Sequence, residues 1–142
     1  QNILFLNNRL FKMNYADSPL CSLCNEVDET EIHLFCECNR TLEVWGKIKL
    51  WLNDRIVIPN LCAKFVMLGK YSMTCQTDLL LNHILLLFKY FIYRNRNNHK
   101  LVTFPNFQKY VASIQNIEKR IAYSKNKLDS HYKKWQLISD LL

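Results

Sequence analysis

The chain has 142 residues, of which 49% are hydrophobic and 22% are charged, a composition typical of one globular domain rather than an array of domains. Two glycines and three prolines are too few for the many tight turns of a β-sandwich, a barrel or a glycine-rich phosphate loop, so the composition favours a mostly helical fold. The net charge of +7 favours a polyanion as partner over an acidic protein surface or a cationic ligand.

The positive charge is concentrated in the C-terminal part of the chain. Residues 1–85 hold eight basic and nine acidic residues, a net charge of −1, whereas residues 86–142 hold eleven basic and three acidic residues, a net charge of +8. Any electrostatic contact with a polyanion is therefore expected to involve residues 86–142.

We expect a single domain over 1–142, with about five helices around a small Cys/His knuckle. A helix entering from an upstream region occupies 1–17 and ends before Pro19, because proline cannot continue it. Apolar residues at helical spacing predict a second helix over 41–53, with Thr41 as its N-cap. Residues 60–77 have no clean period and are expected to form a loop with a short helix or strand.

Three more helices are predicted in the C-terminal half. Thr77 or Asp78 caps a long, mostly apolar helix that runs to about Asn97 and forms the centre of the core. Thr103 followed by Pro105 marks the next helix start. Its apolar face contains Phe107, Val111, Ile114, Ile117, Ile121 and Leu128. Asp129-Ser130 caps the last helix, in which Trp135 is expected to anchor the core.

Four of the six cysteines fall within 18 residues, beside a histidine. The spacing Cys21-x2-Cys24-x8-His33-x4-Cys38 fits a tetrahedral zinc site, since a two-residue gap lets one turn direct both thiolates to one ion. A Cys3His set leaves no open coordination position, so the zinc would be structural and would stabilise the fold.

Cys36 competes with Cys38 for the fourth position. On an ideal helix Cys36 shares the face of His33, and Cys38 lies about 140° away. A helix that ends near Cys36 removes this objection, so Cys38 is favoured, with Cys36 as the alternative ligand. Disulfides, which need an oxidising compartment, and unliganded thiols are the other interpretations of the cluster. Cys62 and Cys75 are expected to be small buried hydrophobic residues.

Several of these residues also carry a resemblance. The segments Ser18-Pro19-Leu20-Cys21-x2-Cys24 and Glu29-Thr30-x2-His33-Leu34-Phe35-x2-Cys38, with Trp45, resemble the zinc-binding (CCHC) module that follows the reverse transcriptase in non-LTR (LINE-type) retrotransposon polyproteins. The apolar run Leu85–Tyr93 resembles the helix after that module, and Glu118-x3-Ala122, Asn126 and Lys134-Trp135 resemble the C-terminal tail. Cys36 departs from the family's usual pattern.

The resemblance implies a C-terminal, RNA-associated segment that helps the reverse transcriptase hold its template RNA during target-primed reverse transcription. It implies one structural Zn²⁺ held by Cys21, Cys24, His33 and Cys38. The implied partners are the element's own transcript, with target DNA as a further candidate, and the reverse transcriptase region of the same polyprotein. The implied location is intracellular, in a cytoplasmic ribonucleoprotein and the nucleus.

No catalytic constellation is recognisable in the sequence. After residue 85 the acidic residues Glu118, Asp129 and Asp140 are too scattered for a two-metal site, and no Pro-Asp follows Cys38 as a restriction-like endonuclease would need. We therefore expect a non-catalytic module with no small-molecule substrate and no membrane span. His83 is expected in or beside the core, and His99 and His131 are expected to face solvent.

Residues 89–100 interleave cations, aromatic rings and amides, a pattern that single-stranded nucleic acids bind. The alternative is that the rings face the core and the cations solvate a helix end. Substitution of Arg94 and Arg96 together is expected to weaken RNA binding without unfolding. A structural or protein-interaction zinc domain that packs on the polymerase without RNA contact is the rival function. The candidate RNA contacts are Lys89, Arg94, Arg96, Lys100, Lys119, Arg120, Lys125, Lys127, Lys133 and Lys134.

Overall fold

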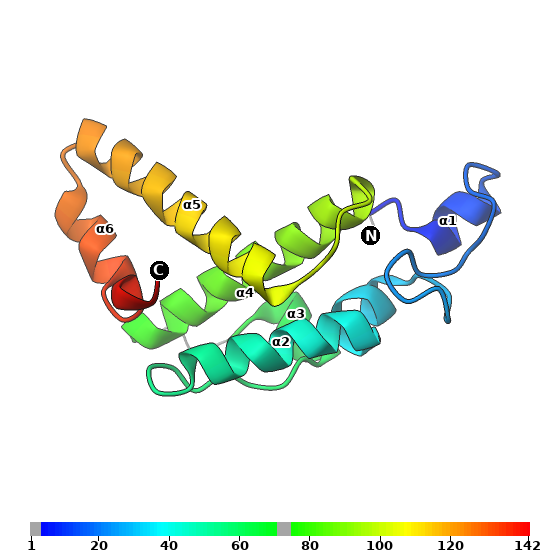
Figure 1. The fold of residues 1–142 in the computed structure, drawn as a ribbon, viewed down its shortest axis with the longest axis horizontal. Coiled ribbons are helices and arrows are strands. Elements are labelled where there is room, and N and C mark those ends of the chain that lie inside the picture. Colours follow the sequence, from blue (N-terminus) through cyan, green and yellow to red (C-terminus); the bar gives the residue numbers. More distant parts are fainter. Residues whose placement is uncertain (1–3, 71–74) are drawn as a thin grey trace.

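The structure, a computed structural model, describes residues 4–70 and 75–142. Within these ranges the mainly helical fold is confirmed, because the chain forms six α-helices, two short helical turns and a single isolated bridge between Leu20 and Asp28 (Figure 1). The elements are α1 (Asn7–Lys12), the π-helical turn η1 (His33–Glu37), α2 (Asn39–Leu52), α3 (Ala63–Leu68), α4 (Gln76–Asn97), α5 (Phe104–Ser124), α6 (Leu128–Trp135) and the 3-10 turn η2 (Ser139–Leu141).

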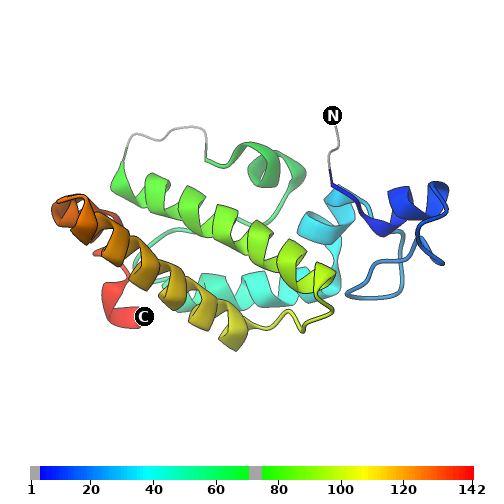
Figure 2. The same ribbon diagram turned by 90° about the horizontal axis from the view of Figure 1, so that it is seen from above.

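Helix α4 forms the centre of the core, as predicted. It runs through the middle of the molecule with α2, α3 and α5 around it (Figure 1, Figure 2). The ring of Phe88 lies 5.0 Å from that of Trp45 on α2 and 5.5 Å from that of Phe107 on α5, so one aromatic cluster joins three helices. No helix among the described residues has the length and apolar character needed to cross a membrane. The buried apolar residues of α4 are Leu80, Leu81, Ile84, Leu85, Leu87, Phe88, Phe91 and Ile92.

The first helix is much shorter than the predicted span 1–17. It begins at Asn7, and the preceding Leu6 is extended and buried. The backbone N–H of Asn7 donates to the Glu29 carboxylate at 2.9 Å, so a residue 22 positions away satisfies the first turn of this helix. Residues 1–3 of the predicted helix lie outside the described residues.

The long helices are placed correctly by the sequence, but most of the predicted caps are wrong. Helix α5 does begin after Thr103, with Pro105 in its first turn. Thr41 lies inside α2, where its hydroxyl donates to the Leu34 carbonyl at 2.7 Å, and Asp78 lies inside α4 and pairs with Lys70. The N-cap of α2 is Cys38 rather than Thr41. The N-cap of α4 is Cys75 rather than Thr77 or Asp78, and the N-cap of α6 is Lys127 rather than Asp129-Ser130.

The apolar face of α5 is only partly covered. Phe107 and Val111 are buried, but Ile117 and Ile121 are 52% and 48% exposed. After crossing α4, helix α5 diverges from it, and α6 returns along α5 (Figure 1). The apolar face in the C-terminal half of α5 is therefore largely outside the core. Leu128, predicted on the same face, instead begins α6.

A polar contact holds the last helix in place. Trp135 is buried, as predicted, and its indole N–H donates to Glu118 Oε2 at 2.8 Å. The Lys134 ammonium lies 2.8 Å from the same oxygen, and the His83 ring meets the Trp135 ring edge-on at 5.4 Å. Burial alone would raise the pKa of Glu118, but hydrogen bonds from Lys134 and Trp135 hold it below its ordinary value.

We expect Glu118→Ala to lower the free energy of unfolding by about 1–3 kcal/mol, because the Trp135 N–H is left buried without its acceptor. Urea unfolding measures the change. Asp54→Ala, at an exposed carboxylate, is the control and should change the free energy by less than about 0.5 kcal/mol. Equal effects of the two variants would contradict the structural role of Glu118.

Candidate metal centre

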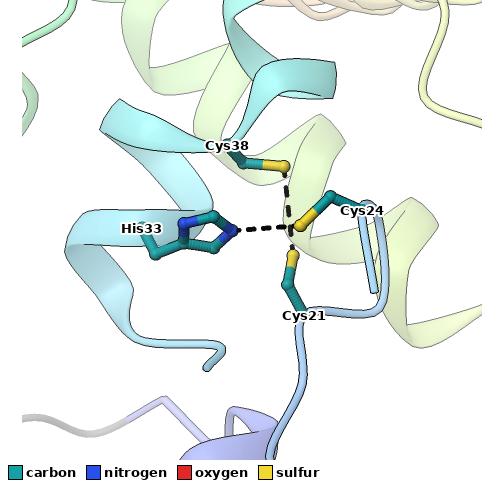
Figure 3. A group of neighbouring side chains, drawn as sticks. All are labelled: Cys21, Cys24, His33 and Cys38. Carbon is teal, nitrogen blue, oxygen red and sulfur yellow. Dashed lines mark hydrogen bonds between the residues drawn. The ribbon is translucent and has the colours of Figure 1, made fainter. Parts of the chain in front are cut away.

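The first two cysteines lie on one tight loop. The Cys21 N–H donates to the Val27 carbonyl, and the Asn25 N–H donates to the Cys21 carbonyl, both at 2.8 Å. Asn25 has a φ of 58°, a left-handed conformation that asparagine tolerates better than most residues. The loop directs the thiols of Cys21 and Cys24 toward the same point (Figure 3).

The other two candidate ligands lie at the two ends of η1. The Cys38 N–H donates to the His33 carbonyl at 2.7 Å, a bond from residue i to i+5 that makes this turn wider than an α-helical one. The wide turn brings the side chain of Cys38 to the face of His33 (Figure 3). The helical turn ends at Glu37, one residue after Cys36, in agreement with the expected end near Cys36, and its π-helical geometry also removes the angular mismatch.

The four donor atoms form a compact group, and two of their separations are close to those of a tetrahedral zinc site. All lie within 4.8 Å of one another, with 3.9 Å between the sulfurs of Cys21 and Cys38 and 3.3 Å between Cys24 Sγ and His33 Nε2. Zinc bonds of about 2.3 Å to sulfur and about 2.0 Å to nitrogen give tetrahedral edges of about 3.8 Å between sulfurs and about 3.5 Å between sulfur and nitrogen. Both separations are close to these edges, so the donor set is compatible with Zn²⁺.

The surroundings favour thiolate at Cys38. The Cys21 thiol can donate to the Cys38 sulfur, and the backbone N–H groups of Thr41 and Arg40, at the start of α2, lower the pKa of Cys38 further. The pKa of Cys21 is raised, because Cys38 and burial both oppose a second thiolate beside the first. A bound dication would favour the second thiolate, because a thiol that coordinates such an ion is deprotonated.

The centre is closed to solvent. Cys21, His33 and Cys38 are buried, and only Cys24 is partly exposed. Four protein donors and little solvent access leave no position for a substrate or a reactive water. The arrangement can hold a metal ion and cross-link the chain, and it matches structural rather than catalytic zinc sites.

The remaining cysteines lie outside this group of donors. Cys36 is buried on the apolar side of η1 with Val66 and Met67 nearby, and burial raises the pKa of its thiol. Cys62 and Cys75 are exposed, so the prediction that they are buried is wrong. They occupy the N-cap positions of α3 and α4, and the Cys62 sulfur accepts from the Phe65 N–H.

A buried ion pair ties the metal-ligand loop to α4. Arg96 and Glu29 have side chains only 9% and 0% exposed, and the Arg96 guanidinium donates to Glu29 Oε1 through Nε and Nη2. The Ser22 N–H donates to Glu29 Oε2 at 2.8 Å, so Glu29 joins the loop between Cys21 and Cys24 to both α1 and α4. Arg96 also donates to the Asn7 side chain and the Phe5 carbonyl.

Arg96 was predicted to contact RNA, and the structure contradicts an exposed role for it. An Arg94 and Arg96 double variant is now expected to lose stability as well as RNA contacts, because Arg96 compensates a buried carboxylate. Lys89 donates to the Val66 carbonyl at 2.8 Å, and Lys134 is held by Glu118, so these two candidates also have partners within the fold.

The other candidate cations are exposed and fall into two groups. Arg94 and Lys100 lie at the C-terminal end of α4, and the remaining five are carried by the last part of α5, the following turn and α6. These ends are on opposite sides of the molecule (Figure 1, Figure 2). The five are Lys119, Arg120, Lys125, Lys127 and Lys133.

The three predicted histidine environments are only partly correct. His83 is partly buried between helices, as expected, and desolvation lowers its pKa. His99 is exposed, but His131 is buried, so its prediction as a solvent-facing residue is wrong. Its neighbours in sequence are polar, and its burial comes from the way α6 packs back onto the fold.

Comparison with protein families gives a match over the N-terminal third of the chain. Residues 1–45 match the family model described as zinc-binding in reverse transcriptase, and this range contains all four donors of the cluster. No curated protein and no solved structure matched the chain.

Proposed function

We propose that this chain is a zinc-stabilised, RNA-binding C-terminal segment of a non-LTR retrotransposon reverse transcriptase. The observation that carries the proposal is the convergence of Cys21, Cys24, His33 and Cys38 within the range that matches a zinc-binding model of reverse transcriptases. The resemblance of later residues to the same polyproteins supports the retrotransposon assignment. In this role the segment is non-catalytic and acts as one domain.

The proposed ligands of a single Zn²⁺ are these four residues. When bound, the ion supplies a four-way cross-link between the 21–24 loop and η1. The loop in turn holds Glu29, and Glu29 holds Arg96 at the end of α4. The metal centre thus fixes the orientation of α1 and the N-terminal loop against the central helix.

RNA binding is supported by the charge distribution. Seven of the ten candidate cations are exposed and form no ion pair among the described residues, and they belong to the segment with a net charge of +8. Contacts from such cations recognise the phosphate backbone rather than the base sequence of the RNA. The proposed partners are the element's transcript, target DNA and the polymerase region of the same polyprotein, in a cytoplasmic and nuclear ribonucleoprotein.

We test RNA binding with the zinc-loaded chain and labelled single-stranded RNA over a salt series. For contacts to four phosphates the affinity should fall about 50-fold between 50 and 200 mM salt, since the slope is about 0.7 per phosphate. No retention of RNA by the folded, zinc-loaded chain would overturn the proposal in favour of a purely structural or protein-interaction domain. A flat salt dependence would contradict phosphate binding by these cations.

A further inference from the structure

The end of the molecule farthest from the metal centre is a helical hairpin with an unusual surface. It consists of the last turns of α5, the turn at residues 125–127 and α6 (Figure 1, Figure 2). The Lys127 N–H donates to the Ala122 carbonyl at 2.8 Å, and Asn126 has a φ of 53°, which closes the turn tightly. We call its exposed cations and tyrosines the hairpin surface: Lys119, Arg120, Tyr123, Lys125, Lys127, Tyr132 and Lys133.

The charge of the hairpin surface is largely uncompensated. None of its five cations forms an ion pair within residues 4–70 and 75–142. Glu118 is neighbouring but is occupied by Lys134 and Trp135. Asp129, in the first turn of α6, is the exposed acid of this end. The surface thus attracts polyanions.

Two tyrosine rings lie among these cations and remain open to solvent. Tyr123 is 72% exposed and Tyr132 is 51% exposed. The Lys119 ammonium lies 5.8 Å from the centre of the Tyr132 ring. Lys119 and Tyr123 are four residues apart on α5 and therefore neighbours on one helix face. Lys119 is thus a neighbour of both tyrosines, and a phosphate bound by Lys119 would lie close to rings on which unpaired bases can stack.

The basic stretch at 89–100 offers a smaller set of exposed groups, namely Arg94, Lys100 and Tyr90. Phe91 is buried, Arg96 and Lys89 have partners in the fold, and the exposed Tyr90 lies beside Tyr110, with the ring centres 6.4 Å apart. Exposed cations and exposed tyrosines are therefore more numerous at 119–133 than at 89–100.

We infer that the hairpin surface binds single-stranded RNA, with unpaired bases stacked on Tyr123 and Tyr132 and phosphates held by the surrounding lysines and Arg120. This rests on the proposed function and adds the place and the strandedness of the contact. Stacking needs bases that are free of a duplex, whereas a duplex presents mainly phosphates and sugars to such a surface.

The experiment compares variants of the full, zinc-loaded chain on single-stranded and duplex RNA. Tyr123→Leu with Tyr132→Leu keeps the apolar area but removes the π faces, and it should weaken single-strand binding at least about tenfold while changing duplex binding less than about twofold. Tyr15→Leu, at a tyrosine 76% exposed outside the hairpin, is the matched control and should change neither.

Charge variants locate the surface independently. Lys125→Gln with Lys127→Gln should weaken binding of both RNA forms and reduce the single-strand salt slope by about 1.4, for two lost phosphate contacts. Asp129→Asn should tighten binding of both. Circular dichroism melts confirm that each variant is folded.

The outcomes separate the two proposals. Suppose that the wild-type chain binds RNA. If the double tyrosine variant then binds single strands as well as the wild type does, or loses affinity for single strands and duplexes in parallel, base stacking at this surface is wrong. The proposed function stands in either case. If the lysine variant also binds as the wild type does, the location is wrong. If the wild-type chain retains no RNA, the proposed function fails and the inference fails with it.

Discussion

Removal of zinc by a chelator is expected to unfold residues 18–40. This segment has little regular structure apart from η1, and binding to a Cys/His site contributes about 10–16 kcal/mol in zinc-finger peptides. That contribution is as large as the whole stability of an ordinary domain, about 5–15 kcal/mol. The chelated protein should therefore lose amide protection in 18–40, as hydrogen exchange with and without chelator would measure.

A matched pair of cysteine variants tests the same point. Cys21→Ser should reproduce the effect of the chelator, because three remaining donors leave the tetrahedral site incomplete. Cys62→Ser, at an exposed cysteine outside the donor group, should keep wild-type protection. Protection of 18–40 that is unaffected by both chelator and Cys21→Ser would show that the segment folds without metal.

Substitution of Arg96 by methionine is expected to cost about 3–5 kcal/mol of stability, because it leaves Glu29 charged and fully buried without its counter-ion. Urea unfolding of the zinc-loaded protein measures this loss. The Arg55–Asp140 pair is the control, since its side chains are 39% and 55% exposed and Arg55→Ala should cost only about 0–1 kcal/mol. Equal costs for the two arginines would contradict the role given to Arg96.

The pH dependence of this loss has a defined sign. Burial raises the pKa of Glu29, but hydrogen bonds from Arg96 and from the Ser22 and Asn7 N–H groups outweigh it, so the pKa is lower than its ordinary value of 4.5. A lowered carboxyl pKa contributes stability that is complete above the ordinary value and is lost as the pH falls through the folded value. The difference between wild type and Arg96→Met should be largest at high pH and shrink as the pH falls, because the buried Glu29 carboxyl of the variant, without Arg96, takes up a proton at a higher pH than that of the wild type.

The sequence predicts the long elements well because their signals are local. Apolar periodicity places α2 and α4 within about two residues of their observed bounds, and Thr103 with Pro105 marks the start of α5. The caps fail because cysteines occupy the N-cap positions of α2 and α4, which residue preference does not suggest. The exposure of Ile117 and Ile121 depends on where α5 leaves α4, which periodicity cannot show.

The donor spacing predicts the metal cluster, but its geometry depends on features that spacing does not encode. Cys38 joins the cluster in place of Cys36 because η1 is a π-turn, set by one backbone bond from Cys38 to His33. The role of Arg96 depends on Glu29, which lies 67 residues away in the sequence. Because its own sequence neighbours form a basic helix end, Arg96 resembled a solvent-exposed phosphate ligand. Pairing over such distances is decided by tertiary packing.

The central claim is that one zinc ion held by Cys21, Cys24, His33 and Cys38 organises this fold, and native mass spectrometry of the cysteine variants tests it most directly. The wild-type chain and Cys36→Ser should each carry one zinc that a chelator removes, whereas Cys38→Ser should lose it. A wild-type chain without metal, or loss of zinc in Cys36→Ser with retention in Cys38→Ser, would contradict the account.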